Sequence, residues 1–420
     1  MTMQKVISAD SHMTEPGDLW RERLDRKYRD DAPRVIKNEK PNGPAYLFVA
    51  PGIHPLAVAG TFAAGRSGDE LREHMKKGYE AARPSGWDPV ERLKDQDLDG
   101  VVAEVLYSSL SIVLLNMKDI ELQQAALRVY NDWLAEFCRH SPRRLAGIGM
   151  YTLQALPDVT EIERCAKLGL KGVLILASDT IDRPYSDEHF DPLWRVCSET
   201  GLPISLHKPL VSGMPLTSAM PTQADLQIHV VHVVEQCLTR MVYGGVFERF
   251  PNLKMVSAEN DVGWIPNWAH RLDHVHAKVA NAKKLPLKPS EYVKRNVWAT
   301  FQDDPLGPGT WQFFGADNYM WASDFPHADS TFPHSLQVIK DNFAGVPVDV
   351  THKIVFDNVN KLYNLGISSP RDAEPTVTGA DSSRSAHSAA NTSHSGNAPR
   401  LRFVMRARTY LSTTPQVGGI

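Results

Sequence analysis

Short runs of apolar residues recur along the chain, and longer stretches with helical spacing separate them. The short runs are rich in aliphatic and β-branched residues, which is typical of buried parallel strands. Between them, segments 121–140 and 226–243 carry apolar side chains at spacings of three and four, which predicts amphipathic helices. The predicted strands cover residues 6–10, 100–107, 145–151, 172–176, 203–207, 253–259, 297–301 and 319–324.

This alternation predicts the fold. Strands that alternate with helices favour parallel βαβ units. Eight of them predict a closed (β/α)8 barrel, the TIM barrel, whose sites lie at the carboxyl-terminal ends of the strands. A doubly wound open sheet is the alternative, but no glycine-rich phosphate-binding loop follows the first predicted strand.

Two regions fall outside the alternation. Residues 16–95 are too long for a simple connection, and we expect an insertion that helps to cover the barrel mouth. Within the tail 367–420, segment 379–400 has only small or polar side chains, which cannot form a core and predict disorder. We therefore expect one barrel domain over residues 1–366, insertion included, followed by a low-complexity tail.

Composition excludes several classes of protein. The 420 residues suffice for a large core, and 46 basic against 49 acidic residues leave a net charge of −3. No basic field therefore exists to bind nucleic acid or an anionic membrane, and no apolar run approaches membrane-spanning length. The four cysteines lie far apart, and the chain begins without a signal-peptide stretch. These features predict a cytoplasmic protein with a small-molecule substrate.

Ionisable residues stand at the ends of three predicted strands. Asp10 and His12 end the first, His207 ends the fifth and Asp324 ends the eighth. In a barrel these ends meet at one mouth, where two imidazoles and two carboxylates would suit a divalent ion: zinc first, with manganese or iron as alternatives. Each residue also has a structural interpretation, as a helix cap for Asp10, a loop hydrogen bond for His207 and a turn cap for Asp324.

The segments around these residues resemble a known family. Ser8–Pro16, Ser205–His207 and Trp321–His327 are similar to the amidohydrolase superfamily, and more narrowly to its branch with aminocarboxymuconate-semialdehyde decarboxylase and related hydrolases and decarboxylases. The resemblance extends over roughly residues 5–366. Further matching segments are Gly86–Pro89 with Arg92–Leu93, Gly245–Lys254, Gly263–Pro266, Arg271–Asp273 and Asp357–Tyr363.

The resemblance implies a (β/α)8 barrel with one catalytic divalent metal ion. It implies His12, His207 and Asp324 as ligands, and Asp10 as a further one in place of the first histidine of the family's His-x-His pattern. Where the family often has a histidine after the sixth strand, this chain has Glu259, a candidate general base or metal-proximal group. The structural alternative for Glu259 is a surface acid in a loop.

Two further residues are candidates for contacting the substrate or supporting the ligands. Glu15 lies three residues past His12, although it could merely orient the turn at Pro16. His327 follows Asp324 in the loop at the same mouth. The resemblance also implies a homodimer, because such barrels are often dimers.

Three functions are compatible with these residues. The first is a metal-dependent hydrolase of a small carboxylate or cyclic amide or carbonyl compound, with a metal-activated water and with Asp324 or Glu259 transferring its proton. The second is a non-oxidative decarboxylase of an aromatic or muconate-like acid, with Asp324 as the proton donor. The third is a barrel that binds a small molecule without catalysis, as Asp10 in the histidine position would permit. The extra carboxylate of Glu259 favours hydrolysis.

Overall fold

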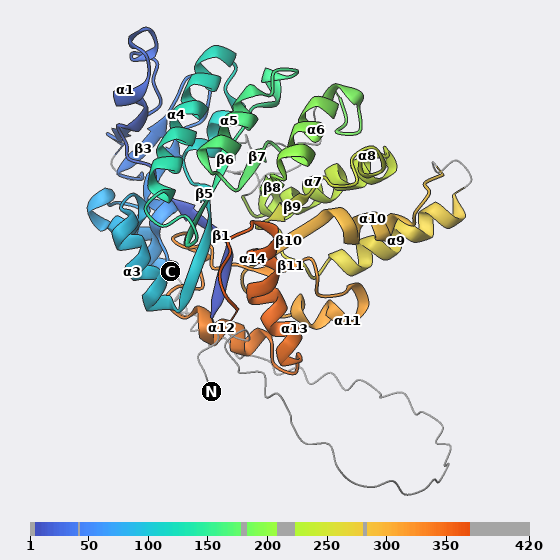
Figure 1. Ribbon diagram of the computed structural model, residues 1–420. Coiled ribbons are helices and arrows are strands. Elements are labelled where there is room, and N and C mark those ends of the chain that lie inside the picture. Colours follow the sequence, from blue (N-terminus) through green and yellow to red (C-terminus); the bar gives the residue numbers. More distant parts are fainter. Residues whose placement is uncertain (1–4, 41–42, 178–182, 208–222, 280–283, 370–420) are drawn as a thin grey trace, which may run out of the picture. The chain divides into compact units, whose positions relative to one another are not determined.

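The computed structural model describes residues 5–40, 43–177, 183–207, 223–279 and 284–369. Eight parallel strands form one nearly closed barrel, which confirms the predicted (β/α)8 fold (Figure 1). The strand order along the sheet follows the order along the chain, as in a (β/α)8 barrel and unlike a doubly wound open sheet. The strands are β1 (Val6–Met13), β5 (Val101–Ser108), β6 (Leu145–Met150), β7 (Gly172–Ile175), β8 (Ile204–His207), β9 (Met255–Ala258), β10 (Val297–Phe301) and β11 (Tyr319–Trp321).

Helices surround the strands (Figure 1). The two amphipathic segments expected from their spacing form α4 (Ile120–Cys138) and α7 (Gln223–Tyr243). Glycines in the left-handed conformation end α5 (Thr160–Leu168) and α6 (Asp191–Thr200). The other helices after the insertion are α3 (Pro89–Asp99), α8 (Val246–Arg249), α9 (Ile265–Lys278), α10 (Pro289–Asn296), α11 (Trp311–Phe314), α12 (Ser335–Asn342), α13 (Val348–His352) and α14 (Asn358–Leu362).

The first and last strands meet at a polar seam. The hydroxyl groups of Ser8, Ser11 and Ser323 lie 2.9–3.1 Å from one another and are buried. Just beyond them, the amide of Asp324 donates to the carbonyl oxygen of Asp10 at 2.9 Å. The seam therefore brings residues that are more than three hundred positions apart in the sequence to the same edge of the barrel mouth.

The segment expected as an insertion contains a small antiparallel sheet that the sequence pattern did not predict. Its strands are short, and proline and glycine residues lie between them, so the segment lacks a clear period. The sheet joins β2 (Arg34–Lys37), β3 (Tyr46–Val49) and β4 (Leu56–Ala57), with α1 (Leu19–Arg23) before it and α2 (Gly68–His74) after it.

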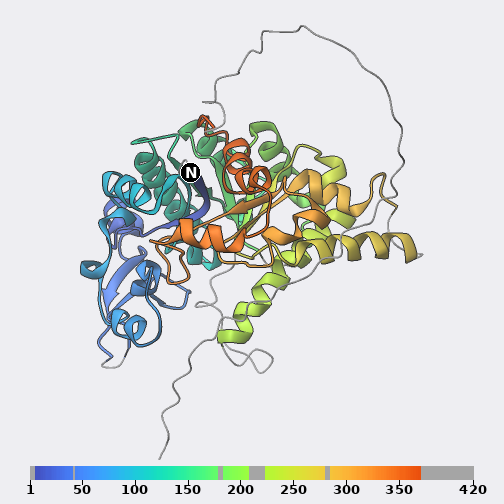
Figure 2. The same cartoon turned by 90° about the horizontal axis from the view of Figure 1, so that it is seen from below.

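These elements group at one side of the barrel and touch its mouth (Figure 2). The amide of Ala64 donates to the carbonyl of Pro326 at 2.9 Å, and the Tyr79 hydroxyl donates to the carbonyl of Glu15 at 2.7 Å. Both acceptors follow strands that carry candidate site residues. The insertion is therefore anchored next to those residues.

Two further findings concern the chain as a whole. Within the described ranges, no helix combines the length and the apolar character needed to cross a membrane. Contacts divide the chain into units Met1–Glu374 and Pro375–Ile420, and the second lies outside the described residues. The expected boundaries at residues 366 and 367, the disordered tail and the homodimer stay predictions.

Candidate active site

The first strand carries two candidate ligands and contains a bulge. Its pairing with β5 runs from Ser8 opposite Glu104 to Ser11 opposite Leu106, so β1 has one extra residue there. The irregular segment includes Asp10, and His12 follows it. Both side chains are fully enclosed, with exposed fractions of 0% and 1%.

The four predicted ligands meet at the mouth of the barrel. His12 Nε2 lies 3.4 Å from Asp10 Oδ1 and 3.3 Å from Asp324 Oδ1. His207 Nε2 lies 3.6 Å from the same Asp10 oxygen and 3.5 Å from Glu259 Oε2. The imidazole rings of His12 and His207 are nearly perpendicular, with centroids 5.0 Å apart. The structure thus brings Asp10, His12, His207 and Asp324 together at one mouth of the barrel, with Glu259 beside them; their role as ligands stays a prediction.

The separations of these atoms fit a shared cation. Two ligand atoms about 2.1 Å from one ion are about 3.0–3.4 Å apart at octahedral or tetrahedral angles. Among the described residues, Asp10 Oδ1, His12 Nε2 and Asp324 Oδ2 have no hydrogen-bond partner although they are buried. His12 Nδ1 lies 3.1 Å from the carbonyl oxygen of Ser108, which can only accept, so Nε2 is the nitrogen left for a metal.

The pKa shifts of the two histidines also agree with a metal site at this position. Burial lowers the pKa of His12, but its contacts with Asp10 and Asp324 outweigh burial and leave the pKa well above its usual value. Burial also lowers the pKa of His207, and the charge of Asp10 reverses the net shift. The carboxylates around both imidazoles therefore favour positive charge at this point, which a bound divalent ion would also supply.

Glu259 and His327 complete a second group of candidate ligand atoms, with His12 and Asp324, within 4.8 Å of one another. The Glu259 side chain is 14% exposed, so it is not a surface acid. His327 Nδ1 lies 3.0 Å from Asp324 Oδ1, and its ring stacks on that of His12 at 3.9 Å. Glu259 and Asp324 both adopt the left-handed backbone conformation, with φ of 58° and 54°. Such strain in non-glycine residues is typical of functional sites.

Glu15 has a different environment. Its carboxylate accepts hydrogen bonds from the hydroxyls of Ser108 and Ser111 and from the amides of Leu110 and Ser111, at 2.5–3.0 Å. It belongs to neither group of candidate ligand atoms. Glu15 instead holds the segment whose Ser108 carbonyl faces His12. The geometry therefore favours support of the ligands, one of the two roles expected for Glu15, over contact with the substrate.

Two residues to which the sequence assigned no role hold the site together. Thr300 accepts from the amide of Glu259 at 2.9 Å and donates to Asp10 Oδ2 at 3.2 Å. Arg92, buried in α3, donates to the carbonyl of His12 at 2.8 Å. Neither residue has a sequence spacing that indicates these contacts, because their partners are 41 to 290 positions away along the chain.

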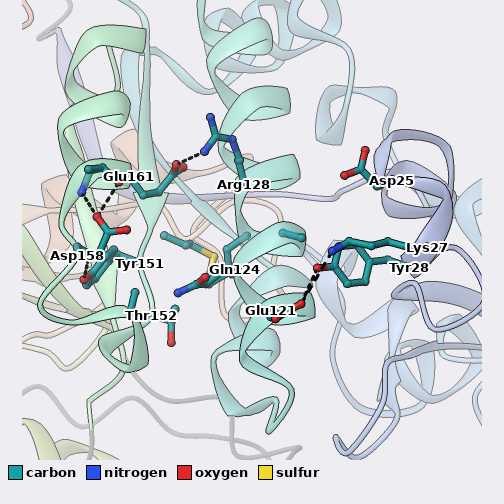
Figure 3. Close-up of a pocket in the computed structure, with 15 residues that line it drawn as sticks. Asp25, Lys27, Tyr28, Glu121, Gln124, Arg128, Tyr151, Thr152, Asp158 and Glu161 are labelled. Carbon is teal, nitrogen blue, oxygen red and sulfur yellow. Dashed lines mark hydrogen bonds and ion pairs between the residues drawn. The ribbon is translucent and has the colours of Figure 1, made fainter.

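A separate cavity of about 350 Å³ lies on the outside of the barrel, between α4, α5 and the segment around Tyr28 (Figure 3). It contains none of the candidate site residues. Its two cationic side chains are paired, with Lys27 3.9 Å from Glu121 and Arg128 3.5 Å from Glu161. We assign no function to it.

Comparison with known proteins identifies the family. An amidohydrolase family model matches residues 53–365, about three quarters of the chain, so the chain belongs to this family. A curated relative, 2-amino-3-carboxymuconate-6-semialdehyde decarboxylase of Dictyostelium discoideum, is 28% identical over 213 residues. That match covers 49% of this chain, and the chain spans only 57% of the relative's length.

Solved structures share the fold. An amidohydrolase from Mycobacterium avium subsp. paratuberculosis has a TM-score of 0.68 at 22% identity, over 88% of this chain and 99% of that one. The 5-carboxyvanillate decarboxylase of Sphingomonas paucimobilis has a TM-score of 0.60 at 25% identity, over 86% and 99%. Related decarboxylases from Novosphingobium aromaticivorans and Polaromonas were solved with bound manganese.

Proposed function

We propose that this member of the amidohydrolase family is a metal-dependent, non-oxidative decarboxylase of a small planar acid, aromatic or muconate-like. The observation that carries the proposal is that the curated relative and the solved structure at 25% identity are both decarboxylases. Asp324, whose buried carboxylate lies 3.3 Å from His12, is the proposed proton carrier, and its position supports the proposal. The proposal reverses the expected order of the two reactions, because Glu259 alone favoured hydrolysis.

His12, His207, Asp10 and Asp324 are the residues that would hold the ion. Two imidazole nitrogens and carboxylate oxygens suit zinc, manganese or iron, and manganese in the related decarboxylases makes it the ion to test first. When bound, the ion would supply a Lewis acid that neutralises negative charge on the substrate. Zinc, the ion expected from the sequence, remains an alternative.

Asp324 would deliver the proton. Burial raises the pKa of its carboxyl group, but the nearby His327 and His12 outweigh burial and hold the pKa below its usual range. His327 Nδ1 lies 3.0 Å from Asp324 Oδ1, which is close enough for a proton to pass between the two groups. Asp324 passes this proton to the carbon that bears the substrate carboxylate. The carbon–carbon bond then breaks, its electron pair returns to the ring or double bond, and carbon dioxide leaves.

Hydrolysis is the second candidate, and one observation favours it. Glu259 projects its Oε2 to within 3.5 Å of His207 Nε2, where it could take a proton from an attacking water. In the proposed decarboxylase, Glu259 would instead orient His207 through the same contact. The two functions therefore differ in whether oxygen from water enters the product.

Isotope labelling distinguishes these functions. The manganese-loaded protein is incubated with hydroxybenzoates, muconates and cyclic amides, in D2O and separately in H2¹⁸O. Decarboxylation gives carbon dioxide and a product with one deuterium at the carbon that lost the carboxylate, and without ¹⁸O. A product with one ¹⁸O atom would support hydrolysis. Tight metal binding without turnover of any of these compounds would support the non-catalytic barrel and contradict the proposal.

A further inference from the structure

We propose that Arg92 of helix α3 is a positioning residue for the metal site. Through two peptide carbonyl groups it fixes the backbone that carries His12 and the backbone that follows Asp324. The inference rests on the proposed function in so far as His12 and Asp324 hold the ion.

The guanidinium group of Arg92 is completely buried. Its Nη1 donates to the carbonyl of His12 at 2.8 Å, and its Nη2 makes a longer contact with the carbonyl of Phe325 at 3.4 Å. On its other side it forms a bidentate pair with Glu104, with Nε and Nη2 2.6 and 3.1 Å from the two carboxylate oxygens. The Phe325 ring stacks against the cation, 4.8 Å away. All of these partners belong to β1, β5 or the segment after β11.

The two carbonyl groups lie where the candidate ligands are joined. The amide of His12 donates to the same carbonyl of Phe325 at 2.7 Å, and the amide of Asp324 donates to the carbonyl of Asp10 at 2.9 Å. Arg92 therefore closes a small network that holds the strands bearing these ligands in register. Among the described residues, no other side chain of α3 donates to the carbonyls of His12 and Phe325.

Stability alone does not explain a charge at this position. Removing two charges from water is costly, and a buried ion pair replaced by apolar residues of similar volume often leaves a protein equally stable or more stable. An apolar pair would fill the same space, but it would not bind the two carbonyl groups. What the guanidinium adds is a fixed fork of donors that sets the positions of both peptide groups.

A double variant separates a positioning role of Arg92 from a role in folding. Arg92→Met with Glu104→Met removes both charges and leaves neither of them buried alone. Asn296→Ala is the matched control: Asn296 is also buried and also donates to two carbonyls, those of Pro251 and Leu253, but at the opposite end of the barrel. Arg92→Lys keeps a cation for Glu104 and loses the fork.

Manganese affinity is measured from the electron paramagnetic resonance signal of free Mn²⁺, and stability from urea unfolding of the metal-free proteins. We expect the double variant to raise the Mn²⁺ dissociation constant at least about tenfold, while its metal-free stability falls no further than that of Asn296→Ala, because each variant leaves two carbonyls without their side-chain donor. Arg92→Lys should have an intermediate effect and should carry the test if the double variant does not fold. Asn296→Ala should lower stability and leave the dissociation constant unchanged. Wild-type affinity in both Arg92 variants, or equal loss in Asn296→Ala, would overturn the inference.

A measurement without metal separates this inference from the proposed function. The ¹⁵N spectrum of histidine-labelled, metal-free protein reports the environment of the His12 ring, which His12→Gln assigns. We expect the His12 ring signals to shift in the Arg92 variants and not in Asn296→Ala. If the wild type binds no divalent ion, the proposed function fails, and the His12 signals still decide the inference: unchanged signals in the Arg92 variants refute it.

Discussion

The two ends of the barrel differ in how far their buried polar groups are satisfied by hydrogen bonds. At the strand beginnings, three buried asparagines each donate from one amide group to two backbone carbonyls, at 2.6–3.1 Å. Asn296 donates to two carbonyls before β9, Asn318 to two carbonyls around the start of β10, and Asn358 to two carbonyls around the start of β11. Neutral amides of this kind satisfy the backbone without bringing a charge into the core.

At the strand ends, the buried groups are ionisable and incompletely satisfied. Asp10, His12 and Asp324 each keep a buried atom without a hydrogen-bond partner within the described ranges. Asp324 also adopts a left-handed backbone conformation. The strand beginnings therefore contribute stability, whereas the strand ends are less stable because some of their buried atoms stay available for a ligand.

The largest expected effect is on turnover, from Asp324→Asn at the strand ends. The amide cannot pass on the proton, so we expect the rate to fall about 10³-fold or more while the melting temperature stays near that of the wild type. Carbon dioxide release at saturating Mn²⁺ measures the rate. The control is Asp329→Asn, an exposed carboxylate of the same loop. Wild-type rates in Asp324→Asn would refute its role as the proton carrier.

The reverse pattern is expected at the strand beginnings. Asn296→Ala leaves two buried carbonyls without a donor, which should lower the free energy of unfolding by about 2–4 kcal/mol. The kcat of the folded protein should not change, because the side chain is at the far end of the strands. Urea unfolding and steady-state kinetics test both statements. A fall in kcat without a loss of stability would contradict the division between the two ends.

Metal removal should act on one end only. Chelation of an ion present at about one hundred times its dissociation constant should cost about 2.7 kcal/mol of apparent stability. The same difference should appear in Asn296→Ala and should disappear in His207→Gln, which lacks a proposed ligand. Thermal unfolding with and without chelator gives the differences. An equal stabilisation by metal in His207→Gln would show that the ion binds elsewhere.

The smallest expected effect concerns a carboxylate near the strand beginnings. Burial raises the pKa of Asp99 to about 6, although hydrogen bonds from Ser335 partly oppose the shift. Between pH 4 and 6 the folded protein therefore holds a proton that the unfolded chain releases, so Asp99 makes stability fall as the pH rises through this window. Asp99→Asn should remove a decline of about 2 kcal/mol. Unfolding by urea at pH 4 to 7 with chelator present compares the two proteins, and parallel curves would refute the assignment.

Local pattern predicted the barrel because each strand and helix carries its own period. The apolar runs at 100–107 and 145–151 became β5 and β6, and segment 121–140 became α4. The short strands β2 to β4 escaped prediction, because runs of two to four residues between prolines and glycines have no measurable period. The local pattern also could not distinguish hydrolysis from decarboxylation, because the same side chains would serve both reactions.

The residue types at the strand ends were enough to indicate where Asp10, His12, His207 and Asp324 would gather, because the ends of parallel strands in a barrel share one mouth. Only the tertiary structure decided which atoms face one another and what holds them: the bulge in β1, the contact of Thr300 with Asp10, and the buried fork of Arg92. The physical reason is that period and residue type act within a few positions of the chain. A hydrogen bond between residues 80 or 290 positions apart exists only after the strands have closed.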